Sequence, residues 1–247
     1  MKILAFETSA KAASVALLTD GQLTGEYFQN SGQTHSRTVM KLAKDLLDNC
    51  DLSPSDLDLI AWANGPGSFT GVRIGVAAAK GLCWGRELPC VPVSTLEAMA
   101  WSAAVQDGIV CCCMDARRSQ VYNAVFEIRD ERPVRIREDR AISIEELAED
   151  LAAFSGPILL TGDGAALVYE TLRVGRAAND RPYRLVPEHR RQQRASGVAL
   201  AAWEAVQAGL TEDPALVLPN YLRLSQAERE RLAKDRERET TDETTQK

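Results

Sequence analysis

The sequence predicts an α/β protein built from two similar lobes. Short apolar runs of strand length alternate with amphipathic helical patterns, first over residues 1–105 and again over residues 106–224. A chain of 247 residues is also long enough to bury one large core or two small ones. We therefore place an N-terminal lobe at 1–105, a C-terminal lobe at 106–224 and a charged tail at 225–247.

The first lobe opens with strands, because β-branched and aliphatic residues cluster between turn signals. The hairpin signal Asp20-Gly21 joins the second strand to the third. Strands are predicted at 2–7, 13–18, 22–28, 59–63 and 91–93. Helices are predicted at 35–49, from an apolar stripe at helical spacing, at 70–84, from a small-residue pattern, and at 94–104, from the capping-box spacing of Ser94 and Glu97.

The second lobe repeats this alternation. Ser143 and Glu146 again have capping-box spacing, and they open a helix that runs to Phe154. Strands are predicted at 109–114, 120–128, 133–141 and 158–161, and further helices at 165–174 and 196–208. Residues 225–247 carry many charges and few large apolar side chains, so we expect a solvated tail or a segment ordered by a partner.

The most distinctive segment is the run NGPGSFTGVRIG at 64–75, which follows the buried strand 59–63. A strand, a glycine turn and a helix start can aim backbone N–H groups at an anion. Gly65 and Gly67 can adopt positive φ, and Thr70 can cap the helix. The same residues also fit a tight turn with no ligand, since the spacing is neither a Walker A loop nor a GxGxxG fingerprint.

Three glycines interrupt the helix predicted at 70–84. Gly71, Gly75 and Gly81 each cost about 1 kcal/mol of helix stability relative to alanine. Close approach of another backbone would offset that cost, so we expect this helix to pack tightly.

Charge and composition limit the function classes. The net charge of −6 argues against strong tRNA binding by this chain alone, because such binding depends on phosphate neutralisation. Arginines are concentrated between Arg173 and Arg194, which fits a solvated loop or an RNA-facing patch. The six cysteines form no C-x-x-C pair and are interpreted as small buried hydrophobes. No signal peptide or membrane-spanning run is evident, so we expect a cytoplasmic protein that contacts no membrane.

Four motifs together resemble the TsaB (YeaZ) family, a bacterial subunit in the formation of threonylcarbamoyladenosine in tRNA. They are KILAFETS at 2–9, GPGSFTGVRIG at 65–75, DARR with VY at 115–122, and PNYLR at 219–223. The resemblance is dense over residues 1–123. It implies an actin-like and Hsp70-like (ASKHA) fold. It also implies partnership with the catalytic paralog TsaD, which transfers the threonylcarbamoyl group to the adenosine next to the anticodon, and with the ATPase TsaE.

The resemblance implies candidate sites as well. ASKHA ATPases place an acidic residue and a phosphate loop at the first turn, and here that turn is Glu7-Thr8-Ser9. The candidate nucleotide or phosphate turn comprises Glu7, Thr8, Ser9, Gly65, Gly67, Gly162 and Gly164, although ordinary turn chemistry explains these residues too. No cofactor is expected to be required by this chain, and ATP or ADP is expected only in the complex.

In the family the helices at 35–49 and 70–84 pack on their counterparts in TsaD, or on a second copy when the partner is absent. The candidate interface residues are His35, Val39, Leu42, Leu46, Val72, Val76 and Ala79. The alternative is that both helices simply pack on their own sheet.

The resemblance also shows what is missing. TsaD carries two metal-binding histidines four residues apart, and the matching positions here are His35 and Val39. Valine cannot ligate a metal, and His189 is the only other histidine, so we expect no metal site and no catalytic residue. The leading hypothesis is a non-catalytic subunit that acts on tRNA through the complex. The alternatives are a stand-alone ASKHA ATPase or kinase and a peptidase that acts on TsaD, although no G-x-S-x-G motif is present.

Overall fold

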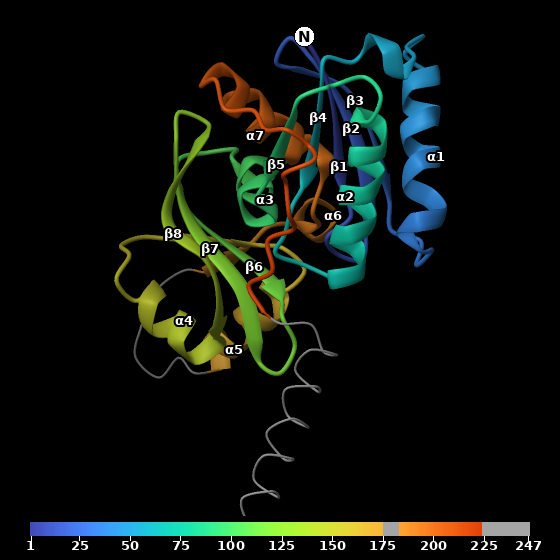
Figure 1. Cartoon of the computed structure of the whole chain (residues 1–247). Coiled ribbons are helices and arrows are strands. Elements are labelled where there is room, and N and C mark those ends of the chain that lie inside the picture. The colour runs from blue at the N-terminus through green and yellow to red at the C-terminus, as the bar shows by residue number, and fades with distance from the viewer. Residues whose placement is uncertain (175–182, 224–247) are drawn as a thin grey trace, which may run out of the picture.

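The computed structural model describes residues 1–174 and 183–223, which form two sheets with their covering helices (Figure 1). The predicted tail at 225–247 lies outside the described residues, as does the middle of the arginine-rich segment. At its two ends, Arg173 and Arg194 form ion pairs with Glu170 and Glu26.

Both lobes have the same sheet topology. Each sheet contains an antiparallel meander of three strands, and two further strands lie parallel beside the first strand of that meander. The orders are β3-β2-β1-β4-β5 and β10-β9-β6-β7-β8. The strands are β1 (Lys2–Glu7), β2 (Ala13–Thr19), β3 (Gln22–Gln29), β4 (Leu59–Ala63), β5 (Cys90–Val93), β6 (Gly108–Asp115), β7 (Gln120–Arg129), β8 (Arg132–Ser143), β9 (Ile158–Thr161) and β10 (Tyr183–Leu185). The predicted ASKHA-type α/β fold with two similar lobes is therefore confirmed.

All but one of the described helices lie within a few residues of their predicted positions; the short helix at Glu188–Arg191 and the strand β10 were not predicted. The helices are α1 (His35–Asp48), α2 (Phe69–Cys83), α3 (Thr95–Ala103), α4 (Ile144–Leu151), α5 (Ala165–Val174), α6 (Glu188–Arg191) and α7 (Ala195–Gln207), with a 3-10 turn at Pro54–Asp56. Ser143 and Glu146 form the predicted capping box, and Ser94 caps α3. The predicted cap of α2 was wrong: Ser68, not Thr70, accepts the Gly71 N–H, because the helix begins one residue earlier than expected.

Two layers of helices cover the first sheet. α1 and α2 pack on one face, where Phe6, Trp62 and Val72 belong to one buried cluster. α7 packs on the other face, where its small residues contact Ala5 and Ala61. α7 therefore returns to the first sheet although it follows the second one in sequence (Figure 1). The lobe boundary at residue 105 stays a prediction; it separates the strands of the two sheets, but not their helices.

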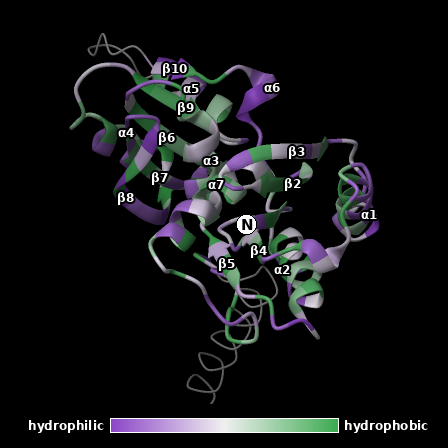
Figure 2. Ribbon diagram, turned by 90° about the horizontal axis from the view of Figure 1, so that it is seen from above, coloured by the Kyte–Doolittle hydropathy of each residue, from purple (hydrophilic) through white to green (hydrophobic). Residues whose placement is uncertain are grey.

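The helix α3 links the two lobes, because Ala98 packs with the first sheet whereas Leu96 and Met99 pack with the second. Hydrophobic residues predominate in strands such as β6 and β9, whereas β8 is largely hydrophilic and α1 carries hydrophilic and hydrophobic residues together (Figure 2). Five of the six cysteines are buried and Cys50 is half-buried; all six are free thiols, which agrees with their interpretation as small hydrophobes. No helix in the described part of the chain is long and apolar enough to cross a membrane.

Candidate functional site

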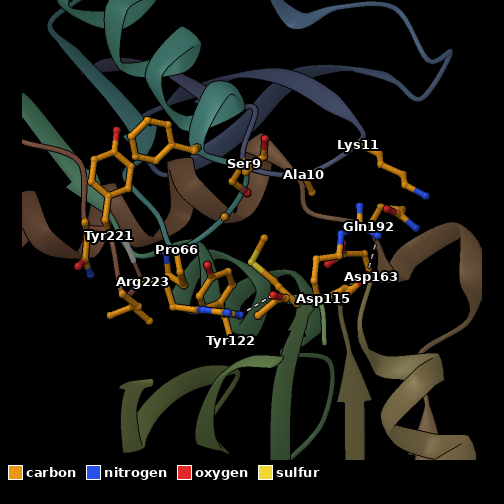
Figure 3. A pocket seen from close by; sticks show the side chains of 18 of the residues that line it. Ser9, Ala10, Lys11, Pro66, Asp115, Tyr122, Asp163, Gln192, Tyr221 and Arg223 are labelled. Atoms are coloured by element: carbon orange, nitrogen blue, oxygen red, sulfur yellow. Dashed lines mark hydrogen bonds and ion pairs between the residues drawn. The ribbon is translucent and has the colours of Figure 1, made fainter. Parts of the chain in front are cut away.

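A cleft of about 570 Å³ lies between the lobes, and the distinctive sequence motifs meet at its walls. The turn after β1, the glycine turn before α2, the end of β6 and the C-terminal motif each contribute residues. Figure 3 shows Pro66, Tyr221 and Arg223 on one side of the cleft and Asp115 and Asp163 on the other. Motifs more than 200 residues apart in the sequence thus form a single site.

The floor of the cleft is the turn that follows β1. The Glu7 carboxyl accepts a hydrogen bond from the Ser9 N–H at 2.6 Å, and the Thr8 hydroxyl donates to the Gly71 carbonyl at 2.8 Å. Ser9 lines the cleft, and its carbonyl accepts the Ser68 N–H at 2.7 Å. The turn is therefore bonded directly to the glycine motif at the start of α2.

The glycines of α2 allow this contact. An added Cβ would lie 2.2 Å from the Thr8 carbonyl at Gly71 and 2.4 Å from the Thr8 hydroxyl at Gly75. The close approach of another backbone that the glycines predicted is confirmed at Gly71, whereas at Gly75 the close neighbour is the Thr8 side chain. The prediction was wrong for Gly81, where an added Cβ meets no atom of the described chain within 4 Å.

The other glycines of the candidate nucleotide turn are engaged in backbone packing. An added Cβ would lie 2.5 Å from the Ser9 carbonyl at Gly67 and 2.4 Å from the Asn220 carbonyl at Gly65. In the second lobe it would lie 2.2 Å from the Cys113 carbonyl at Gly162 and 2.8 Å from the Asp115 nitrogen at Gly164. Of the seven predicted residues, Ser9 and Gly67 line the cleft, and the other five support its walls. Their nucleotide role stays a prediction.

Two carboxyl groups, those of Asp115 and Asp163, lie on the second-lobe side of the cleft near Arg117. Asp163 lies in the cleft, accepts a hydrogen bond from the Gln193 amide at 2.9 Å, and has a pKa raised by burial and by nearby Asp115. Asp115 accepts the Arg117 N–H at 2.7 Å. No group of three or more His, Cys, Asp or Glu side chains within residues 1–174 and 183–223 is placed to hold a metal ion.

Burial raises the pKa of Glu7 to about 7, although hydrogen bonds from Ser9 oppose the shift. Its second oxygen, Oε2, has no hydrogen-bond partner among the described residues. Between pH 4.5 and 7 the folded chain thus binds a proton that the unfolded chain has released, so stability falls as pH rises through this window. Above pH 7 the free energy of unfolding is lower than at acidic pH by about 3 kcal/mol.

We expect Glu7→Gln to remove this pH dependence, because the amide carries no charge and its oxygen can still accept the Ser9 N–H. Urea unfolding at pH 5 and pH 8 measures it. The variant should be more stable than the parent by about 3 kcal/mol at pH 8 and near parity at pH 5. Glu131→Gln, at an exposed turn, is the matched control and should leave the pH dependence intact. A parent-like pH dependence in Glu7→Gln would contradict the assignment.

The predicted interface residues mostly face inward. Five of them, Val39, Leu46, Val72, Val76 and Ala79, are at most 6% exposed and lie in the core beneath the first sheet. Leu42 packs half-buried against that core. The His35 ring lies 2.7 Å from the Ala10 carbonyl, which ties the start of α1 to the β1–β2 turn. The apolar stripe of each helix therefore covers the chain's own sheet, and other residues form the outward faces.

Sequence reasoning missed the C-terminal wall of the cleft. Asn220, Tyr221, Leu222 and Arg223 all line it, although nothing in their composition indicates contact with residues 64–73 or 116. The PNYLR motif was recognisable in the sequence, but the motif alone does not indicate which segments of the fold it contacts.

Comparisons of the sequence with known proteins point to one group of tRNA-modification proteins. A family model described as TsaD, tRNA N6-adenosine threonylcarbamoyltransferase, matches residues 29–231. The tRNA threonylcarbamoyladenosine biosynthesis protein TsaB of Bacillus subtilis is 33% identical over 92% of this chain and 96% of its own length. TsaB of Escherichia coli is 37% identical over 66% of this chain and 72% of its own.

Solved structures agree with this result. YeaZ from Pseudomonas aeruginosa superimposes with a TM-score of 0.76 at 26% identity, covering 90% of this chain and 99% of that one. The sequence and the structure thus match the same proteins along nearly the whole chain. The chain belongs to the TsaB (YeaZ) family of tRNA threonylcarbamoyladenosine biosynthesis proteins.

Proposed function

We propose that this chain is a non-catalytic subunit required for threonylcarbamoyl transfer to the adenosine next to the anticodon, and that it binds and supports the catalytic paralog TsaD. The observation that carries the proposal is its similarity to a TsaB protein over 92% of the chain. The position of Val39 supports the non-catalytic role. The family resemblance implies that this residue corresponds to the second metal-binding histidine of TsaD, and it is buried in the core of the first lobe.

The partner surface is formed by the outward faces of α1 and α2. Ala77 and Gly81 are exposed on α2, and their small size lets another helix approach closely. Met40 on α1 and Trp84 at the end of α2 are 42% and 85% exposed, so both side chains offer apolar area to a partner. We therefore expect these exposed residues to contact the partner, in place of the inward-facing residues that the sequence suggested.

The same surface serves a homodimer when the chain is alone, and a larger cytoplasmic complex includes the ATPase TsaE and contacts tRNA. This chain needs no cofactor of its own, and ATP or ADP binds within the complex.

Size-exclusion chromatography with light scattering, on the chain alone and mixed with its TsaD, tests the proposal. We expect a homodimer that exchanges into a 1:1 heterodimer. A reconstituted system should then modify tRNA only when both chains are present. A monomer that ignores TsaD would overturn the subunit role and favour the stand-alone ATPase, which calorimetry with ATP and magnesium would then test.

A further inference from the structure

The proposed function leaves two motifs without a role, DARR at 115–118 and PNYLR at 219–223, and the structure brings them into contact. Arg223 donates from Nη1 to the Ala116 carbonyl at 2.6 Å. This bond joins the last described residue of the chain to the turn between β6 and β7 in the second lobe (Figure 3).

The rest of the C-terminal motif is anchored on the first lobe. Val217 is buried in the core beneath the first sheet, and the Asn220 N–H donates to the Asn64 carbonyl at 2.8 Å. The Asn64 side-chain amide in turn donates to the Leu218 carbonyl at 2.8 Å. The lack of a side chain at Gly65 lets the Asn220 carbonyl approach this closely.

An aromatic stack fixes the motif on α2. The rings of Tyr221 and Phe69 are 4.4 Å apart and nearly parallel. Arg73 donates to the Tyr221 hydroxyl at 2.8 Å, and its guanidinium lies 3.8 Å from the centre of the Phe69 ring. Stacking and a hydrogen bond thus act on the Tyr221 side chain, two residues before Arg223, and the cation–π contact of Arg73 holds its stacking partner Phe69.

The turn that Arg223 reaches is conformationally unusual. Arg117, Arg118 and Ser119 have φ values of 66°, 56° and 55°, so three consecutive residues with side chains adopt the left-handed region. Such residues are disfavoured there unless surrounding contacts hold them. A charged donor on the Ala116 carbonyl supplies one such contact, because hydrogen bonds to charged groups are stronger than neutral ones.

We propose that Pro219–Arg223 is a clamp between the lobes, in which Tyr221 anchors the motif on α2 and Arg223 holds the β6–β7 turn in its left-handed conformation. Arg223 is a positioning residue, since it fixes the turn that orients Asp115 and Arg117 at the cleft. This clamp acts within the chain and does not depend on TsaD.

Hydrogen exchange on the isolated full chain tests the clamp, read by mass spectrometry at peptides covering 115–120. Backbone bonds from Ala116 to Gln120 and from Gln120 to Arg117 protect these amides. We expect Arg223→Ala to speed their exchange about tenfold, the effect of losing one charged hydrogen bond. Tyr221→Ala should produce a similar increase without touching the turn, and the double variant should add little to either. Arg223→Lys, which keeps the charge, should restore part of the protection.

The matched control is Arg118→Ala, which removes an exposed arginine from the same turn and should leave exchange at 115–120 unchanged. Peptides from β2 and β3 report whether a variant is unfolding globally, and they should exchange as in the parent. Parent-like exchange at 115–120 in Arg223→Ala would overturn the clamp. An equal increase in every peptide would also overturn it, since Arg223 would then serve only general stability. Neither result affects the TsaD-binding proposal, which chromatography tests separately.

Discussion

Gly71→Ala is expected to destabilise the chain by about 3 kcal/mol, near the upper end of the cost of overpacking a core. The added methyl group would lie 2.2 Å from the Thr8 carbonyl, which is backbone and cannot rotate away. The start of α2 would have to move off the β1–β2 turn, breaking the bond from the Thr8 hydroxyl to the Gly71 carbonyl. Thermal unfolding should show a Tm roughly 10 °C below that of the parent.

Gly81→Ala is the matched control in the same helix. An added methyl group meets no described atom within 4 Å there, so the higher helix propensity of alanine should raise stability by about 0.5–1 kcal/mol. The two substitutions are chemically identical and are predicted to have opposite signs. If Gly71→Ala were as stable as Gly81→Ala, the tight contact between α2 and the first turn would be contradicted.

Ala77→Asp is expected to weaken heterodimer formation with TsaD at least a hundredfold, or about 2.7 kcal/mol, while the isolated chain stays folded. Ala77 is exposed on the outward face of α2. A partner helix packed there would meet a larger, charged side chain in place of a methyl group and would have to strip water from the carboxylate, which is strongly unfavourable. The loss should appear as separate peaks in size-exclusion chromatography of the mixture and as loss of tRNA modification in the reconstituted system.

The control for Ala77→Asp is Ala166→Asp, the same change at an exposed position of α5 in the second lobe. It should leave the heterodimer intact. Val76→Asp would not test the interface. Val76 is only 6% exposed, so its substitution should unfold the first lobe. A heterodimer that tolerates Ala77→Asp as well as Ala166→Asp would place the TsaD contact elsewhere on the molecule.

The sequence by itself determined most of the elements, because their signals are local, but it did not predict β10 or α6. The β9 strand and the α5 helix match their predicted ranges fully, and the capping box of Ser143 and Glu146 starts α4 as expected. The apolar stripe of α1 was also predicted correctly from its 3.6-residue period. The motifs identified the family, since the run at 64–75 and the first turn are long enough to be specific.

Only the tertiary structure decided which face of each helix is free. A stripe such as Val39 and Leu46 satisfies the same periodicity whether it packs on its own sheet or on a partner, so the sequence could not choose between them. The structure places that stripe inside the core and leaves Ala77 and Gly81 outside.

The cleft likewise required the complete fold. Glu7, Asp163 and Arg223 become neighbours of one site only because the two sheets and the returning C-terminal segment close around it. No local propensity encodes such contacts, since they depend on the packing of segments that are distant in the sequence. The sequence therefore determined what the parts of this TsaB-family protein are, whereas tertiary packing decided which of their residues remain available for function.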